Sequence, residues 1–368
     1  MRRKLERLDI PGEHEARERA WGLVQAAYAA REPQPRPRPL IRPLLVAAAV
    51  AALVAAGLSP PGRAVLESVR KVIGVEGAEQ SLLSLPANGR VIVHSTAGPW
   101  IVGSNGTRRL LGPYDQASWS PQGLYVVASR GRELMALTPR GDVRWRRAAS
   151  GLVDLPRWSP SGFRIAYHVG GGLRVVAGDG TGDRLLAPAV EHIGTAWRPG
   201  TAHVLTYANR RGVIVVEDVD SGRRLWSRRL AKRPHLMLWS PDGARLLVLA
   251  ERTILVFRRD GTLLMRIAPN WAPQTAAFAP RGHTFAVVAG LPGRSEVRIG
   301  RRVIFSGTGA FNGIDWSPDG RWLLIGWGSA DQWVFVRTTG EPSIRAVANV
   351  SAQFQAAVFP SLGGWCCS

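Results

Sequence analysis

Short apolar runs, each bounded by glycine, proline or small polar residues, recur along the chain after residue 120. Each run is five or six residues long and is rich in Val, Leu, Ile and aromatic side chains. Runs of this length and composition, set between turn residues, predict β-strands. They occupy residues 124–128, 164–169, 204–208, 245–250, 284–289 and 322–327.

A short phrase precedes every run. In its fullest form it reads Trp-Ser-Pro-Asp-Gly. Proline presets φ and glycine accepts positive φ, so the phrase predicts the tight turn between the first and second strands of a repeating unit. The aromatic residue would pack between neighbouring units. Its copies are Trp119, Trp158, Trp197, Trp239, Phe278 and Trp316.

The spacing of these six aromatic residues indicates the architecture. The intervals are 39, 39, 42, 39 and 38 residues, and a second turn, such as residues 138–142, follows within the units. This is the length of one four-stranded propeller blade rather than of a helical repeat. The pattern therefore predicts six complete blades.

A seventh blade is expected from the two ends of the repeat region. Residues 356–360 look like a first strand, because Phe359 lies 43 residues after Trp316, and residues 89–95, 100–102 and 108–112 supply three more. Joining them would remove open sheet edges. Alternatively, residues 84–90 are a degenerate copy of the phrase. This also predicts seven blades, but the ring would then be closed by a different combination of strands. We predict an all-β, seven-bladed β-propeller over residues 81–368.

The phrase at residues 239–243 and 316–320 resembles the PD40 repeat, also described as TolB-like or WD40-like. Residues 217–226 also resemble a quinoprotein-type repeat. The whole layout is similar to uncharacterised membrane-anchored propeller proteins of bacteria. These resemblances imply architecture and location, because a fold does not determine a function.

The region before the propeller contains an apolar segment. Residues 43–62 lie between Arg42 and Arg63 without a charge, and 20 residues of helix reach about 30 Å, the thickness of a hydrocarbon core. We predict a single transmembrane helix there; a buried or cleaved helix is the alternative. A small excess of arginine before it places the N-terminus in the cytoplasm and the propeller outside. Residues 1–42 would then be a cytoplasmic helical segment with a Pro/Arg tether, and 63–80 an amphipathic juxtamembrane helix and linker.

Charge and cysteine content add little about function. The chain carries 48 Lys and Arg against 27 Asp and Glu, a net charge of +21. This favours attraction to anionic surfaces such as phospholipid head groups, although solubility and genome composition explain it equally simply. No nucleic-acid recognition motif occurs. Cys366 and Cys367 are adjacent, and we expect them to form neither a disulfide with each other nor a metal site. They could form an intermolecular disulfide outside the cell, or the C-terminal tail could have no function.

Candidate chemistry is sparse. The seven histidines show no metal-ligand spacing, and neither a nucleophile elbow nor a phosphate-binding Gly-rich loop occurs, so we expect no metal and no cofactor. Turns between second and third strands and the connections between blades should share one face and surround the channel mouth. Arginines there could bind an anionic ligand or an acidic protein surface, or could simply be exposed. The predicted rim residues are Arg130, Arg132, His168, Arg210, Arg211, Arg252, Arg294, His192, His235 and Trp271.

These observations favour a non-enzymatic, membrane-anchored propeller outside the cytoplasm that binds a protein or an anionic envelope component as a scaffold or sensor. One alternative is an enzyme of quinoprotein or hydrolase type with its site in the central channel. The enzyme alternative would be favoured if His168, His192 and His235 lay close to one another and to a carboxylate in the channel. Another is an envelope assembly factor resembling TolB.

Overall fold

The computed structural model describes residues 82, 84–200 and 202–367. The predicted segments 1–42, 43–62 and 63–80 lie outside the described residues. Within the described part, no helix has the length and apolar character needed to cross a membrane. The structure described below is therefore that of the repeat region.

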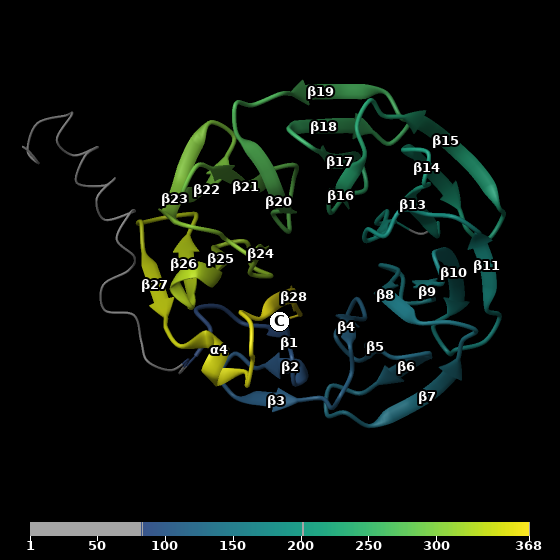
Figure 1. Cartoon of the computed structure of the whole chain (residues 1–368), viewed down its shortest axis with the longest axis horizontal. Helices are drawn as coiled ribbons and strands as arrows, with labels where there is room; N and C mark the ends of the chain where they lie inside the picture. The colour runs from purple at the N-terminus through teal and green to yellow at the C-terminus, as the bar shows by residue number, and fades with distance from the viewer. Residues whose placement is uncertain (1–81, 83, 201, 368) are drawn as a thin grey trace, which may run out of the picture. The chain divides into compact units, whose positions relative to one another are not determined.

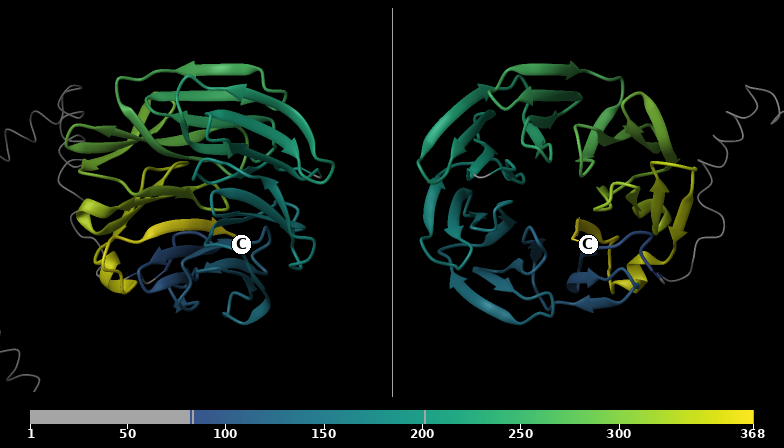
Figure 2. Two further views of the ribbon diagram at one scale, coloured as in Figure 1. Left: turned by 45° about the vertical axis from the view of Figure 1, so that its right-hand side comes forward. Right: turned by 180° about the vertical axis from the view of Figure 1, so that it is seen from behind.

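The repeat region forms seven four-stranded antiparallel sheets around a central opening (Figure 1). This confirms the predicted all-β, seven-bladed propeller. Six blades take four consecutive strands each, and the seventh combines strands from both ends of the region in the order β28-β1-β2-β3. The view from behind in Figure 2 shows the same closed ring.

The first four blades are continuous in sequence. Blade 1 comprises β4 (Gln116–Trp119), β5 (Val126–Arg130), β6 (Glu133–Leu137) and β7 (Val143–Ala148). Blade 2 comprises β8 (Val153–Trp158), β9 (Arg164–Val169), β10 (Gly172–Ala177) and β11 (Arg184–Ala187). Blade 3 comprises β12 (Ala196–Trp197), β13 (Val204–Ala208), β14 (Val213–Asp218) and β15 (Arg223–Arg229). Blade 4 comprises β16 (Pro234–Trp239), β17 (Arg245–Ala250), β18 (Thr253–Arg258) and β19 (Leu263–Ile267).

The remaining blades complete the ring. Blade 5 comprises β20 (Ala272–Phe278), β21 (Phe285–Leu291), β22 (Arg294–Ile299) and β23 (Arg302–Thr308). Blade 6 comprises β24 (Gly313–Trp316), β25 (Trp322–Trp327), the 3₁₀ turn η1 (Gly328–Ala330), β26 (Gln332–Arg337) and β27 (Ile344–Val347). The short helix α4 (Val350–Gln353) leads into blade 7, which comprises β28 (Ser361–Cys366), β1 (Arg90–Ser95), β2 (Gly98–Val102) and β3 (Arg108–Leu110).

The core lies between the blades. The apolar runs found in the sequence are second strands, and β25, for example, is buried at all six of its residues. The fourth strands lie at the periphery, and β19 is exposed at all five of its residues. Each blade thus buries its middle strands against its neighbours, which explains why the second strands are continuous apolar runs rather than alternating ones.

The serine of the phrase closes the turn that proline and glycine begin. In blade 6 the Ser317 N–H donates to the Trp322 carbonyl at 2.9 Å, and the Trp322 N–H donates to Ser317 Oγ at 2.9 Å. Gly320 adopts a φ of 72° and donates its N–H to the Ser317 carbonyl at 2.8 Å. The same bonds recur in blades 1, 2 and 4. The phrase therefore forms the predicted turn between first and second strands.

The aromatic residue of the phrase also links blades. Nε1 of Trp197 donates to the carbonyl of Arg157 at 3.1 Å, and Nε1 of Trp316 donates to the carbonyl of Ala277 at 3.1 Å. In both cases the acceptor immediately precedes the phrase aromatic of the previous blade. Nε1 of Trp119 donates in the same way to Gly364, at 3.2 Å. The residue after Gly364 therefore holds the aromatic position of blade 7.

Blade 7 closes the ring with one C-terminal strand, as expected, but with different residues. The prediction of a strand at 356–360 is wrong: β28 starts at Ser361, and Trp365 rather than Phe359 takes the aromatic position, opposite Val91. Residues 84–89 form no strand, so the alternative closure is also excluded. The regular repeat spacing predicted the wrong aromatic residue because α4 and the irregular segment after it lengthen the connection between blades 6 and 7.

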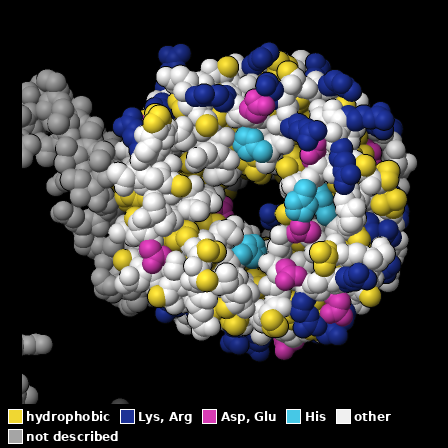
Figure 3. Space-filling view, in the orientation of Figure 1, with side chains coloured by type: hydrophobic (Ala, Val, Ile, Leu, Met, Phe, Trp, Pro, Cys, Tyr) yellow, Lys and Arg dark blue, Asp and Glu magenta, His cyan; other side chains and the backbone are white. Residues whose placement is uncertain are grey.

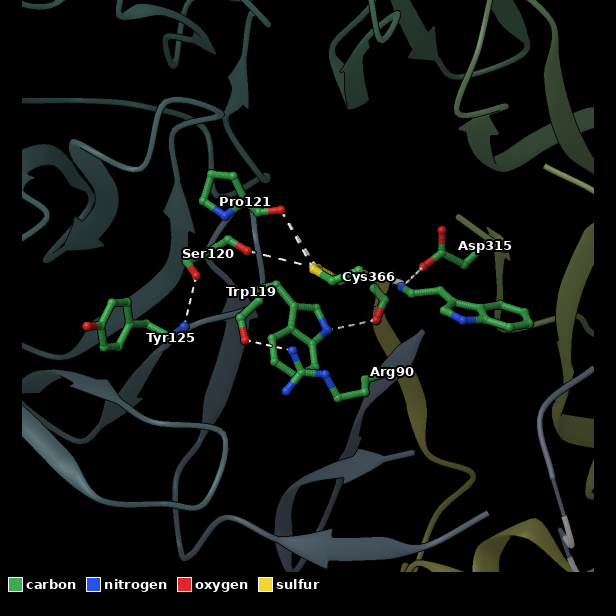
Figure 4. Close-up of a disulfide and its surroundings, with 11 residues drawn as sticks. Arg90, Trp119, Ser120, Pro121, Tyr125, Asp315 and Cys366 are labelled. Atoms are coloured by element: carbon green, nitrogen blue, oxygen red, sulfur yellow. Dashed lines mark hydrogen bonds between the residues drawn. A yellow bond between two sulfur atoms is a disulfide. The ribbon is translucent and has the colours of Figure 1, made fainter. Parts of the chain in front are cut away.

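The two cysteines end β28. In the structure the Sγ atoms of Cys366 and Cys367 lie next to each other, and the expectation that the two cysteines form no disulfide with each other stays a prediction. Sγ of Cys366 lies 3.9 Å from the carbonyl oxygen of Ser120, and Sγ of Cys367 lies 3.7 Å from that of Pro121 (Figure 4). Strand pairing with β1 and contact with the blade 1 turn hold this end of the chain in place, so it is not an idle tail.

Candidate functional site

One face of the propeller, here called the rim face, carries the turns between second and third strands and the connections between blades. Histidine side chains lie at several places around its central opening, with acidic and basic side chains near them (Figure 3). A cleft of about 350 Å³ opens on this face. Its lining residues, called the rim pocket below, are His168, Gly171, Val190, Glu191, His192, Arg210 and Arg233.

Strand pairing in blade 2 brings an acidic residue to the rim pocket. Asp154 on β8 lies directly opposite His168 on β9, and the register shifts immediately after it. Leu155 adopts a φ of 49° in this bulge, and its N–H donates to Gln116 Oε1 of blade 1 at 2.8 Å. Bulges re-aim side chains at strand ends. The bulge here leaves the Asp154 carboxylate 2.8 Å from Nε2 of His192, on the connection to blade 3.

His168 is the buried member of the pocket. Only 3% of the residue is exposed, and its ring meets the ring of His192 edge-on at a centroid distance of 5.9 Å. Burial lowers the pKa of His168 to about 4, and the positive charge of His192 adds to the effect, although Asp154 opposes it. Neither ring nitrogen has a hydrogen-bond partner. Both nitrogens lie below the surface, so near neutral pH His168 is a neutral imidazole in the wall of the pocket.

Basic side chains border the other side of the pocket. Arg210, on the turn between β13 and β14, lies against Gly171, where an added Cβ would collide with the guanidinium group. Gly171 also has a φ of 84°, so this close approach suits glycine. Nε of Arg233 lies 3.6 Å from Oε1 of Glu191. The Glu191 backbone N–H donates to the Ala208 carbonyl at 2.8 Å, which fixes this connection between blades.

Three of the predicted rim residues thus meet in one place: His168, His192 and Arg210. Arg233 joins them, and Asp154 and Glu191 were missed by the sequence reasoning. The position of Asp154 depends on the pairing of β8 with β9. The local sign of the bulge is Pro156, because a proline inside a strand is found at edges or bulges. Glu191 lies next to His192 in sequence, so its place on the same connection between blades could be predicted with that of His192.

Other predicted rim arginines contact groups of their own surroundings. Arg130 forms an ion pair with Glu133 at 3.0 Å, and Arg294 forms one with Glu296 at 3.0 Å. Arg252 donates to a backbone carbonyl at residue 270, at 2.8 Å. The structure therefore does not bring the rim arginines of separate blades to a single point.

The last four predicted rim residues are also separate from the pocket lining. Arg132 and Arg211 are exposed. Nε2 of His235 lies 3.0 Å from a backbone carbonyl of blade 5. The ring of Trp271 stacks under the guanidinium of Arg298, 5.6 Å from the ring centroid. His235 thus does not join the two pocket histidines.

A second cleft, of about 290 Å³, opens into the central channel. Its lining includes Arg157, Asp315, Trp158 and Trp365. The Asp315 carboxylate accepts hydrogen bonds from the backbone N–H groups of Trp365 and Trp316. Burial nevertheless raises the pKa of Asp315 to about 7, although the nearby charge of Arg157 opposes the shift. This acid could exchange a proton near neutral pH.

Metal binding has no support in the described part of the chain, where no group of three or more His, Cys, Asp or Glu side chains is placed to hold an ion. Beside the rim pocket, the Asp154 carboxylate pairs with Nε2 of His192, and the ring of His168 meets the ring of His192 edge-on. The arrangement is that of a polar binding pocket.

Comparison with known proteins identifies the fold and no family. No protein-family model and no curated protein sequence matches the chain. A chain in the crystal structure of the mitotic checkpoint complex is similar, with a TM-score of 0.52 and 15% identity over 63% of this chain and 76% of that chain. A chain of Kuenenia stuttgartiensis hydrazine synthase has a TM-score of 0.49 and 14% identity over 60% and 75% of the two chains. The likeness to the checkpoint-complex chain shows the fold alone at this identity, and the resemblance to PD40 and TolB-like repeats stays a prediction.

Proposed function

We propose that this chain is a non-enzymatic binding propeller whose rim pocket accepts a polar segment of a partner protein. The observation that supports this most directly is the open cleft of about 350 Å³, whose lining brings together His192, Arg210 and Arg233. The His192 side chain is 70% exposed, so it is within reach of a partner. A carboxylate of a partner would be held by the guanidinium groups of Arg210 and Arg233 and by the ring of His192.

The pocket's mixed charge favours a protein segment over a simple anion. The lining contains Glu191 as well as Arg210 and Arg233, so it offers both donors and acceptors. Its residues come from four parts of the chain around blades 2 and 3. Propeller faces of this kind suit protein binding, and the wall of charged groups would select a partner of complementary charge.

Photo-crosslinking tests this proposal. A photo-reactive amino acid at position 211, beside the pocket, is expected to give a single adduct of defined mass in cells, because a bound partner would lie within reach. The matched control places it at position 223, an exposed arginine on the opposite face. Arg210→Glu in the same chain should reduce the adduct roughly tenfold or more, since a reversed charge repels the partner. Equal adducts at 211 and 223, or no effect of Arg210→Glu, would contradict the proposal.

We further propose that residues 43–62 anchor the propeller in a membrane, with residues 1–42 in the cytoplasm and the propeller outside. The support is the uncharged segment and the excess of arginine before it. Tags at Met1 and Ser368 in intact cells are expected to differ, with the first protected from added protease and the second cleaved. Protection of both tags would exclude this topology, and permeabilised cells in which both are cleaved provide the control.

The enzyme alternative depends on the channel cleft. Asp315, with its pKa near 7, is the kind of group that general acid–base chemistry uses. The hydroxyl of Ser118 in the same lining is engaged, because it donates to the Pro156 carbonyl at 2.8 Å. A nucleophile paired with a base is therefore not formed by these residues, and binding remains the function we propose. An envelope assembly role like that of TolB would be one form of such binding.

A further inference from the structure

A third cleft, on the face opposite the rim pocket, gathers arginines from two blades. Its volume is about 510 Å³, and it lies between blade 7 and blade 1. Arg90 and Arg109 contribute from blade 7, and Arg140 and Arg144 from the second hairpin of blade 1. We call these four residues and the cleft they line the arginine groove. A volume of this size falls within the range of small-molecule sites.

Three of the four guanidinium groups have no partner among the residues that the structure describes. Arg109, Arg140 and Arg144 are exposed, and among the described residues none of their side chains forms a hydrogen bond or an ion pair. Arg130 and Arg294 on the rim face, in contrast, are paired with glutamates. Each guanidinium carries five N–H donors, so the groove holds many donors that the protein itself does not use.

The fourth arginine is held in place. Nη2 of Arg90 donates to the Gly123 carbonyl at 2.8 Å, and its guanidinium carbon lies 4.8 Å from the ring centroid of Trp119. Stacking on an aromatic face and a backbone hydrogen bond restrict the side chain to one orientation. Arg90 therefore provides a fixed positive charge at one wall of the groove.

The single carboxylate in the lining does not neutralise the groove. Oδ2 of Asp142 accepts a hydrogen bond from Thr138 Oγ1 at 2.8 Å, which keeps the carboxylate within its own turn. No ion pair joins Asp142 to an arginine among the described residues. Four guanidinium groups and one carboxylate leave a net charge of +3 around the cleft.

We propose that the arginine groove binds a ligand carrying a multiply charged phosphate group, either a soluble polyphosphate or a phosphate monoester head group of a lipid. Guanidinium forks bind phosphate oxygens in pairs, and convergent arginines are the usual protein device for a group with more than one negative charge. This site is independent of the rim pocket. It lies on the other face, so its failure would leave the proposed partner binding untouched.

Calorimetry on the full-length chain in non-ionic detergent tests the groove with two probes, inorganic tripolyphosphate and dihexanoyl phosphatidic acid. One-to-one binding of at least one probe is expected. The variant Arg109→Gln/Arg140→Gln/Arg144→Gln should weaken it on the order of 100-fold, because several charge-assisted hydrogen bonds are lost together. The matched control, Arg223→Gln/Arg229→Gln/Arg266→Gln, removes the same charge from exposed sites elsewhere and should keep wild-type affinity within about threefold.

The outcomes separate the two sources of phosphate. Binding of tripolyphosphate alone would identify a soluble ligand, and binding of the short-chain lipid alone a head group; both support the groove. Saturable binding of neither probe, preference for citrate over both, or equal weakening in the groove and control variants would overturn the proposal. Equal melting temperatures of the two triple variants would show that the difference does not arise from unfolding.

Discussion

Replacing Trp365 by alanine is expected to lower the free energy of unfolding by roughly 3–5 kcal/mol, the cost of removing a large buried aromatic side chain. Trp365 is 7% exposed and meets the ring of Phe335 edge-on at a centroid distance of 5.9 Å. It belongs to the core cluster that joins blades 6 and 7. Urea unfolding followed by tryptophan fluorescence would measure the change.

Comparing the unfolding free energies of Trp365→Ala and Phe359→Ala shows which of the two aromatic residues closes the ring. Phe359 is half-buried and packs only at the edge of the same cluster, so its loss should cost less, under about 2 kcal/mol. A larger cost at Phe359 than at Trp365 would contradict the register described above. Trp365→Phe should lose only about 1 kcal/mol, because Nε1 of Trp365 has no hydrogen-bond partner to leave unpaired.

Removing residues 361–368 would extend the same test. This deletion takes away β28 entirely and leaves β1 with an open edge toward the central opening. Open sheet edges promote association between chains, so we expect aggregated rather than monomeric protein by size-exclusion chromatography. Deletion of Ser368 alone is the control and should leave a monomer.

The blades could be predicted from sequence because their signals are local. The turn at Ser317 and Gly320 is made by residues within one phrase, and each phrase predicts the strand that follows it. The closure could not be predicted in the same way. Trp365 follows two glycines instead of standing in a phrase, and the connection before it contains α4, so spacing alone pointed to Phe359.

The rim pocket was predicted in part for a related reason. Propeller topology assigns His168, His192 and Arg210 to one face from the order of strands, so three of its members could be named. The ion pair between Asp154 and His192 depends on a bulge that moves one strand relative to the next. A one-residue change of register alters which side chains meet. Pro156 favours an irregularity in β8, but the pairing that results and the hydrogen bond from Leu155 to Gln116 are seen only in the structure.

Stability should fall as the pH is lowered from about 6.5 to 4, because two histidines resist protonation in the folded state. Burial lowers the pKa of both His168 and His94 to about 4, whereas the unfolded value is 6.5. The unfolded chain takes up these protons first, so stability that is present above pH 6.5 is lost as the pH falls toward 4. The loss of unfolding free energy is at most about 3 kcal/mol for each histidine.

Asp315 acts in the opposite direction. Its pKa in the folded state is raised to about 7, so its contribution to the free energy of unfolding is largest at low pH and is lost as the pH rises through 7.

The variant His168→Leu isolates one of these contributions. At pH 7 it should change stability little, since no hydrogen bond of the His168 ring is lost. At pH 4.5 it should be more stable than the wild-type protein by about 2 kcal/mol, because leucine takes up no proton beside His192, Arg210 and Arg233. Urea unfolding across this pH range measures the difference. Val169→Ala, on the same strand, is the control and should lower stability by a similar amount at every pH. A His168→Leu profile parallel to that of the wild-type protein would mean that His168 is protonated freely in the folded state, and the rim pocket would then present a cation instead of a neutral imidazole to its partner.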